Sequence, residues 1–377
     1  MMNKPQRLTI NFYTTHYDIV FGHGVINNIP KYLNEITKNK KVLIVADIFF
    51  QLTEGIQIKN LLSNSGYEVY TYYMNAGKGN KNVNEILKIY SILEKHNFAR
   101  DSVLIALGGG VIGDLAGFVA STWLRGMKLV HIPTTLMAMV DSSIGGKVAI
   151  NFRQTVNAIG NYYHPVYNIM DLDFINSLSN KDYYSGIAEV IKCAIIYDKD
   201  FYDYLQKEKT FILQRSNQHL VEFILKSIQI KTVHVNGDLR EGGKRLLLNY
   251  GHTLGHAIEI STEKNHQEQL RHGEGVSVGI VAAAFIAEKY LGLATDILKS
   301  HEQLFLDYQL PVNISANALG FEREFLIKRC CENIKKDKKR KDNNIRVVLS
   351  KNIGSAKVFN EVPFDMIRAA FKYVIKE

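Results

Sequence analysis

Residues 102–113 read Ser-Val-Leu-Ile-Ala-Leu-Gly-Gly-Gly-Val-Ile-Gly, and this stretch decides the fold of the N-terminal half of the chain. Its first six residues form a short apolar run, which is typical of a strand covered on both faces. Glycines follow directly and open an apolar helical segment. Glycines let the backbone approach a phosphate, and a helix N-terminus offers it free N–H groups. The order strand, glycines, helix predicts a dinucleotide or phosphate site; a tight packing turn is the structural alternative.

Strand-like and helix-like segments alternate around this stretch. Residues 41–46, 67–74 and 128–133 are further strand-like runs, and amphipathic segments such as 83–96 lie between the strands. This alternation predicts an α/β domain with a parallel sheet. Residues 7–21 alternate polar and apolar side chains, which indicates a separate antiparallel pair.

The pattern changes after residue 172. Helical spacing recurs over residues 181–197, 200–213, 219–233, 252–262 and 274–291, and a strand signal returns only at 345–349. We therefore predict an α/β nucleotide-binding domain over residues 1–172, followed by a mainly α-helical domain over residues 173–377. The apolar segment 275–287 is expected to be a buried helix.

Composition narrows the class of protein. The chain has 377 residues, 46% of them hydrophobic, and no apolar run reaches the ~20 residues that span a bilayer. The N-terminus lacks a signal peptide's apolar core, and three cysteines without a CxxC pair exclude a disulfide framework and disfavour a thiolate zinc site. We expect a cytoplasmic protein.

The net charge of +9 favours binding of either nucleic acid or small anionic ligands. The basic run at 335–341 is not accompanied by an aromatic RNA-binding motif, so a small acidic molecule fits as well.

A second polar loop follows the strand at 128–133. It contains Thr134 and Thr135, then the sequence DSSIGGK at residues 141–147. An acid, two hydroxyls, two glycines and a lysine within seven residues suit a phosphorylated or polyhydroxylated ligand.

The helical half carries candidate metal ligands. His252 and His256 are four residues apart, so both side chains can share one helical face. His272 follows, and Glu189 lies on an earlier predicted helix with Lys192 three residues on. A set of two histidines and one glutamate leaves one position open on a tetrahedral zinc ion, which is the catalytic arrangement.

Five motifs together resemble the 3-dehydroquinate synthase family of the sugar-phosphate cyclase superfamily. They are GGGVIGDLAG at 108–117, DSSIGGK at 141–147, GIAEVIK at 186–192, LNYGHTLGHAIE at 248–259 and HGE at 272–274. Their order and spacing match over nearly the whole chain. The resemblance implies an NAD-binding α/β domain, a helical metal-binding domain, an active site between them and a homodimer.

The resemblance also implies a reaction. The family converts 3-deoxy-D-arabino-heptulosonate 7-phosphate to 3-dehydroquinate and phosphate, with NAD that is recycled and a divalent metal, Zn²⁺ or Co²⁺. Oxidation of a ring hydroxyl acidifies the neighbouring proton, phosphate is eliminated, the ketone is reduced again, and an aldol step closes the ring. Such a small anionic sugar phosphate agrees with the positive charge of the chain.

Residue roles are carried over from the family by motif. The implied metal ligands are Glu189, His252 and His272, whereas His256 would contact substrate and handle protons. The implied substrate residues are Asp141, Lys147, Asn157, Lys192, Lys231, Arg245 and Asn249, with Arg125 supplied across the dimer and either Lys338 or Lys339 from the basic run. The implied NAD residues are Asp47, Lys81, Gly109, Gly110, Asp114, Thr134 and Thr135, and Lys147 is assigned to the cofactor as well.

Two positions depart from the family pattern. Lys78 follows Gly77 where a glutamate is usual, and Val156 precedes Asn157 where a lysine is usual. We expect Arg153 to supply the missing cation. The alternative is a divergent cyclase of secondary metabolism that acts on another sugar phosphate, of the sedoheptulose 7-phosphate or glucose 6-phosphate type. A metal-dependent alcohol dehydrogenase and a basic nucleic-acid-binding protein are the more remote alternatives.

Overall fold

The computed structural model describes residues 5–12, 15–153, 155–264, 269–338 and 345–377. Its contacts divide the chain into two units: unit 1 comprises residues 1–178 and 235–240, and unit 2 comprises residues 179–234 and 241–377. The boundary expected after residue 172 precedes this division by one short helix, α5 (Asp173–Ser177), which unit 1 retains.

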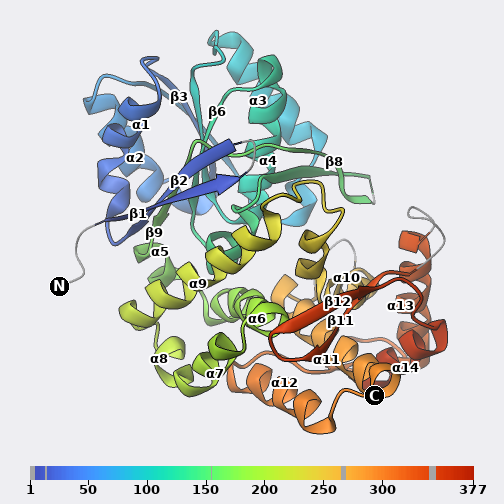
Figure 1. Ribbon diagram of the computed structural model, residues 1–377. Helices are drawn as coiled ribbons and strands as arrows, with labels where there is room; N and C mark the ends of the chain where they lie inside the picture. The colour runs from blue at the N-terminus through green and yellow to red at the C-terminus, as the bar shows by residue number, and fades with distance from the viewer. Residues whose placement is uncertain (1–4, 13–14, 154, 265–268, 339–344) are drawn as a thin grey trace. The chain divides into compact units, whose positions relative to one another are not determined.

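Unit 1 is built on a seven-stranded sheet with the order β1-β2-β9-β6-β5-β3-β4 (Figure 1). The strands are β1 (Gln6–Phe12), β2 (Thr15–Gly22), β3 (Lys41–Asp47), β4 (Glu68–Met74), β5 (Val103–Gly108), β6 (Lys128–Pro133) and β9 (Tyr167–Asp171). Only β1 and β2 pair antiparallel; all other neighbours are parallel. The predicted parallel sheet is thus confirmed. β1 and β2 do form the antiparallel pair expected over residues 7–21, but the expectation that this pair is separate is wrong, because β2 also pairs with β9 and joins it to the main sheet. Every residue of β5 is buried, as a strand covered on both faces requires.

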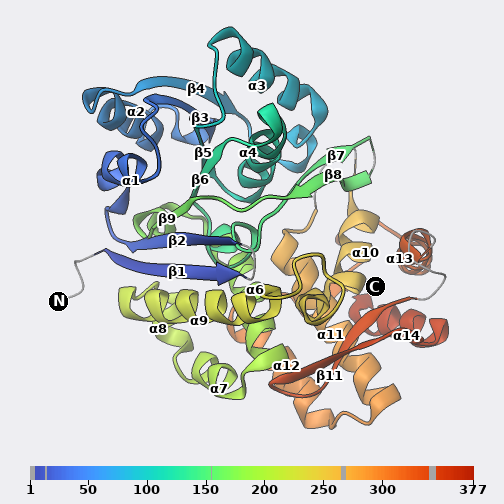
Figure 2. The same cartoon turned by 45° about the horizontal axis from the view of Figure 1, so that its top comes forward.

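Helices join the strands of unit 1. They are α1 (Ile29–Ile36), α2 (Glu54–Asn64), α3 (Val83–Lys95), α4 (Gly110–Thr122) and α5, with short helical turns η1 (Val25–Asn28), η2 (Ile48–Phe50), η3 (Lys78–Asn80), η4 (Trp123–Arg125) and η5 (Ala138–Ser142). A separate hairpin, β7 (Lys147–Phe152) and β8 (Thr155–Tyr162), packs on α4 and is visible in Figure 2. We did not expect this hairpin from the sequence, because seven of the eight residues of β8 are exposed and so show no alternation of buried and exposed positions.

Unit 2 is mainly helical, as predicted. It contains α6 (Asn180–Tyr197), α7 (Lys199–Lys207), α8 (Lys209–Leu213), α9 (Asn217–Val235), η6 (Lys244–Asn249), α10 (His252–Thr262), α11 (His272–Leu291), α12 (Thr295–Asp307), α13 (Arg323–Lys338) and α14 (Phe364–Val374). Two short strand pairs complete it: β10 (Ile314–Ser315) with β13 (Ile375–Lys376), and β11 (Val347–Asn352) with β12 (Ser355–Phe359).

Helix α11 forms the centre of unit 2. It packs against α6, α10, α12 and α14, and its residues from Gly275 to Ala284 are all buried. This confirms the buried helix expected at residues 275–287. The single helix expected over residues 200–213 is wrong, because Glu208 separates α7 from α8 and caps neither through its side chain. None of the helices in the described ranges is both long and apolar enough to cross a membrane.

Candidate active site

The glycine turn lies at the carboxyl edge of the sheet in unit 1. β6, β5 and β3 are adjacent parallel strands, so the residues at their carboxyl ends, Thr134, Gly108 and Asp47, lie along one edge. The Thr134 N–H donates to the Gly108 carbonyl at 3.1 Å. Open parallel sheets bind ligands outside this edge. The sheet therefore brings together three parts of the expected NAD site.

Neighbouring side chains closely approach the glycines of this turn. A Cβ on Gly110 would lie 2.9 Å from Ser142 Oγ, and one on Gly109 would lie 3.2 Å from Thr135 Cγ2. Gly109 is the N-cap of α4, and no side chain caps that helix. Its first N–H groups and the helix dipole thus face the turn, where they favour an anionic group.

Lys81 connects residues expected to bind NAD and substrate. Its side chain is 8% exposed, and the ammonium group pairs with Asp114 and donates to Asn157 Oδ1 at 2.5 Å. The backbone N–H of Asn157 in turn donates to Asn151 Oδ1 at 2.9 Å. Asp47 is oriented separately, because its carboxylate accepts the Phe49 N–H at 3.1 Å. Three predicted site residues of unit 1 therefore form one polar cluster.

The remaining predicted residues of unit 1 lie in short helical turns or at the start of a strand. Asp141 is in η5, Lys147 is exposed at the start of β7, and Arg125 is exposed at the end of η4. The Arg153 guanidinium, expected to replace the missing cation at Val156, lies 5.4 Å from the centre of the Phe152 ring. Both Arg153 and Val156 are exposed to solvent.

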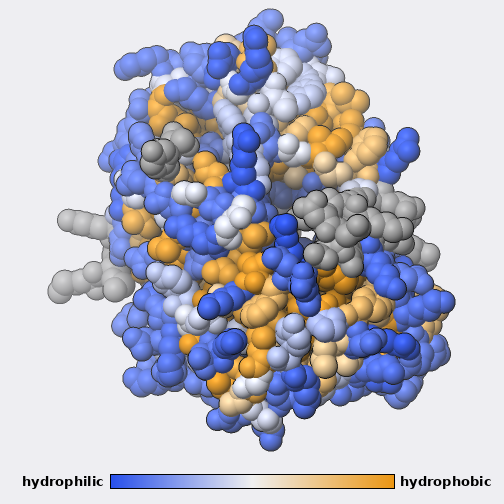
Figure 3. All heavy atoms as spheres, turned by 45° about the vertical axis from the view of Figure 1, so that its right-hand side comes forward, coloured by the Kyte–Doolittle hydropathy of each residue, from blue (hydrophilic) through white to orange (hydrophobic). Residues whose placement is uncertain are grey.

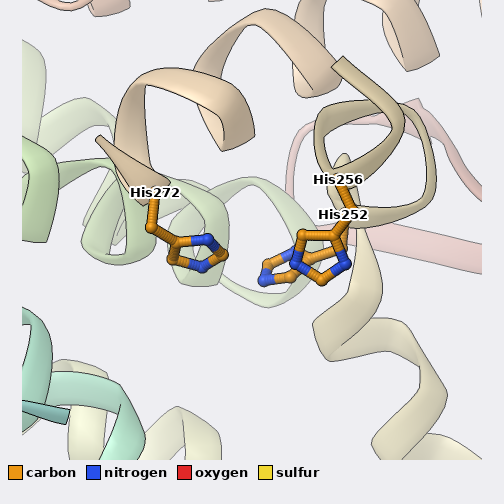
Figure 4. Close-up of side chains that lie close together, drawn as sticks. All are labelled: His252, His256 and His272. Atoms are coloured by element: carbon orange, nitrogen blue, oxygen red, sulfur yellow. The ribbon is translucent and has the colours of Figure 1, made fainter. Parts of the chain in front are cut away.

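Three histidines of unit 2 point toward one another (Figure 4). His252 and His256 lie on α10 and His272 is the first residue of α11, and one ring nitrogen from each falls within 4.8 Å of the others. Glu189 on α6 joins this cluster: its Oε1 lies 3.3 Å from His252 Nε2 and 3.5 Å from His272 Nε2. Nitrogen and carboxylate donors in this number suit zinc and similar divalent ions.

Two of the histidines are held by hydrogen bonds at Nδ1. His252 Nδ1 lies 3.2 Å from the Tyr250 carbonyl oxygen, and His272 Nδ1 lies 3.1 Å from Glu259 Oε1. An Nδ1–H donated to either acceptor leaves the lone pair of Nε2 for a metal. Both Nε2 atoms face Glu189 Oε1, so the donor set Glu189, His252 and His272 converges on one point. His256 is exposed, and its nitrogen can also take part in a three-histidine set.

Electrostatics at this cluster favour a cation. Glu189 and Lys192 are each 1% exposed and form a buried ion pair. Burial raises the pKa of the Glu189 carboxyl, but Lys192 and His252 outweigh burial and hold that pKa well below its usual range. Burial lowers the pKa of His272, yet Glu259 and Glu189 raise it to about 10. Glu189 is therefore ionised at neutral pH, and positive charge beside it is stabilised.

Other predicted substrate residues lie in the same unit. Arg245 is 1% exposed, Lys231 is 6% exposed, and the Asn249 amide donates to Glu241 Oε1 at 2.8 Å. Lys338 is the last residue of α13, and Lys339 lies outside the described residues.

Sequence reasoning missed Glu241 and Glu259. Glu259 follows His252 by seven residues and His256 by three, so helical spacing places it on the same face of the helix as both histidines. This spacing could have identified Glu259 from the sequence. Glu241 lies in a loop, where no periodicity identifies it.

Two consecutive segments of the sequence match two family models. Residues 71–185 match that of the 3-dehydroquinate synthase N-terminal domain, and residues 186–340 match that of the C-terminal domain. The chain is 37% identical over 367 residues to the 3-dehydroquinate synthase of Nostoc sp., covering 96% of this chain and 97% of that one. It is 36% identical over 365 residues to that of Rippkaea orientalis, with the same coverage.

Solved structures share the fold at lower identity. The 2-epi-5-epi-valiolone synthase of Streptomyces hygroscopicus subsp. jinggangensis, with NAD⁺ and Zn²⁺ bound, has a TM-score of 0.83 at 23% identity and covers 95% of this chain and 96% of its own. A 2-deoxy-scyllo-inosose synthase complexed with carbaglucose-6-phosphate, NAD⁺ and Co²⁺ also scores 0.83, at 22% identity, covering 98% and 100%. The glycerol dehydrogenase of Schizosaccharomyces pombe scores 0.65 at 16% identity and covers 94% and 88%.

Proposed function

Because the chain belongs to the 3-dehydroquinate synthase family, we propose that it converts 3-deoxy-D-arabino-heptulosonate 7-phosphate to 3-dehydroquinate and phosphate, as a phosphate-eliminating carbon–oxygen lyase. One observation of the site carries the proposal: the Nε2 atoms of His252 and His272 converge on the buried carboxylate of Glu189, whose other oxygen pairs with Lys192. This arrangement combines a metal donor set with a cation suited to an anionic substrate.

The glycine turn and the Lys81 cluster would hold NAD. The N-terminus of α4 favours the pyrophosphate, and Gly109 and Gly110 leave room for its approach. Asp47, at the end of β3, would accept hydrogen bonds from the ribose hydroxyls, and Asp114 pairs with the Lys81 ammonium. Thr134, Thr135 and Lys147 complete the proposed cofactor set. NAD bound here would accept a hydride from the substrate and return it, so the enzyme would not consume it.

Glu189, His252 and His272 would hold one Zn²⁺ or Co²⁺ ion. The ion would act as a Lewis acid on substrate oxygen. The protein's own contribution is to keep Glu189 ionised through Lys192 and to fix both histidine rings at Nδ1. His256, exposed beside the other two rings, is assigned to proton transfer with substrate and not to the metal.

Buried cations would recognise the anionic substrate. Lys192, Lys231 and Arg245 are at most 6% exposed, and burying a cation is costly unless negative charge lies nearby. The substrate carboxylate and phosphate would add such charge. Asp141, Lys147, Asn157, Asn249 and either Lys338 or Lys339 are the other proposed substrate residues.

A homodimer would supply Arg125 from a second copy. Support comes from the exposed apolar residues Phe152, Val156 and Ile159 of the β7–β8 hairpin, at 46%, 45% and 37% exposure. Figure 3 shows further apolar patches among hydrophilic side chains on one face. Sedimentation of the purified protein would measure its mass in solution, and a monomer at micromolar concentration would contradict this part of the proposal.

Val156, at a position where the family usually has a lysine, favours one alternative function. A sugar-phosphate cyclase that acts on a different substrate would need no lysine at this position. A panel of the heptulosonate phosphate, sedoheptulose 7-phosphate and glucose 6-phosphate, assayed for phosphate release and product mass, separates the two. We expect turnover of the first, with phosphate far exceeding the added NAD and no lasting NADH absorbance. Stoichiometric NADH would instead indicate a dehydrogenase.

A further inference from the structure

Glu259 is a buried carboxylate that faces the metal cluster without joining the proposed donor set. It lies on α10, is 6% exposed, and its Oε1 is 3.1 Å from His272 Nδ1. The opposite ring nitrogen, His272 Nε2, lies 3.5 Å from Glu189 Oε1. One imidazole therefore bridges two carboxylates, with Glu259 on the side away from Glu189.

The packing of α11 makes room for this carboxylate. A Cβ on Gly275 would lie 2.5 Å from Glu259 Cγ and 2.6 Å from Glu259 Oε1, distances that a side chain cannot occupy. Gly275 is three residues after His272, on the same side of the helix. Helix α11 thus supplies both the ring that donates the hydrogen bond and the space for its acceptor.

The two candidate ligand histidines are anchored by different groups. His252 Nδ1 approaches the backbone carbonyl of Tyr250 at 3.2 Å, which no side-chain substitution removes. His272 Nδ1 approaches an ionisable carboxylate, and hydrogen bonds to charged groups are roughly twice as strong as neutral ones. The Nδ1 side of the His272 ring is therefore held by a replaceable side chain.

We propose that Glu259 is a positioning residue, which holds His272 in the tautomer and orientation that present Nε2 to the metal. The proposal rests on the assignment of His272 as a ligand. A metal at Nε2 would take the place of the proton there, the Nδ1–H would remain donated to Glu259, and the carboxylate would make the ring a better donor. Gly275 acts with Glu259 because it provides the space that the carboxylate occupies.

The test is metal binding by Glu259→Gln, measured by competition with a chelator and by the visible absorption spectrum of the cobalt-loaded protein. We expect affinity to fall by about 10- to 100-fold and the cobalt bands to shift, since an amide is a weaker acceptor than a carboxylate. Gly275→Ala, which keeps the charge but displaces the carboxylate, should have the same effect. If Glu259→Gln does not fold, Glu259→Asp, which withdraws the acceptor by one methylene, should show the smaller loss.

The matched control is Glu288→Gln, which removes one carboxylate from α11 at a place where it pairs with Lys289 and Thr295. Metal affinity and the cobalt spectrum should be unchanged in this variant. Equal losses in Glu288→Gln and Glu259→Gln would show a net-charge effect and overturn the proposal, as would wild-type affinity in both Glu259→Gln and Gly275→Ala. Loss of metal in His272→Ala with wild-type binding in Glu259→Gln would preserve the ligand assignment and overturn only the positioning role.

Discussion

The two units build their candidate sites by opposite means. In unit 1 the glycine turn, which we propose holds NAD, is made from backbone, with Gly109 and Gly110 where a Cβ would meet Thr135 or Ser142. In unit 2 the metal cluster is made from charged side chains that are almost fully buried, including Glu189 and Lys192. An uncapped helix N-terminus lowers the stability of the protein little, whereas burying an ion pair carries a desolvation penalty. Substitutions at the glycine turn of unit 1 should therefore impair function without changing stability much. In unit 2, the groups needed for function should themselves lower the stability of the fold.

The largest effect is expected at the buried ion pair. Lys192→Met leaves the Glu189 carboxylate without its ammonium partner, which should lower the free energy of unfolding of the metal-free protein by ~3–5 kcal/mol. Urea denaturation in the presence of a chelator measures it. The double variant Glu189→Leu/Lys192→Met should recover most of the stability but neither metal nor activity. A double variant as unstable as Lys192→Met would contradict the opposition of function and stability in unit 2.

Acid should add a new buried charge to unit 1, at His131. Burial lowers the pKa of His131 on β6 to about 4, and it does the same to His301 on α12 of unit 2. Between pH 6.5 and 4 the unfolded chain binds protons that the folded chain does not, so stability falls as pH falls through this window. The loss is on the order of 3 kcal/mol for each histidine. Denaturation of His131→Gln across this range should show a shallower pH dependence than wild type; an unchanged slope would refute the assignment.

A smaller effect is expected at the glycine turn. The Cβ of Gly110→Ala would press on Ser142, so NAD affinity should fall about tenfold or more, equivalent to ~1.4 kcal/mol. Titration of NAD followed by tryptophan fluorescence measures it. Zinc stoichiometry serves as the internal control, because the metal cluster lies in unit 2 and should remain intact. Unchanged NAD affinity would show that the turn only packs helix against sheet.

The smallest effect is expected at the hairpin. Arg153 is exposed and lies over Phe152, and exposed ion pairs contribute only ~0.2–1 kcal/mol. Arg153→Ala should raise the KM for substrate or NAD only a few-fold, and less at high salt. Adding Val156→Lys to the Arg153→Ala variant should bring the KM back toward the wild-type value. Unchanged steady-state kinetics in Arg153→Ala would remove Arg153 as the replacement for the missing cation.

Sequence patterns predicted the elements whose burial repeats along the chain. Strands β3 and β5 are continuous apolar runs, and α10 ends at the predicted residue, because a buried face leaves a readable period. The β7–β8 hairpin and the break between α7 and α8 at Glu208 were not predicted. An exposed strand and a one-residue helix break leave no periodic pattern of apolar residues in the sequence. The convergence of Glu189, His252 and His272 followed from motif resemblance. The anchoring of His272 by Glu259 required coordinates, because it depends on how α10 packs against α11.

The assignment of residues 235–240 to unit 1 has a consequence for rearrangement of the gene. Both flanking segments belong to unit 2, so the chain changes unit at three places and no single cut separates the two. Lys231 precedes this segment and Glu241 follows it, so the segment lies between two polar residues of unit 2. A hybrid that takes only residues 1–178 from a relative would combine them with residues 235–240 of this chain, so that unit 1 would be made from two different proteins. Recombination among relatives should therefore preserve the N-terminal half and this short segment together, as one inherited block.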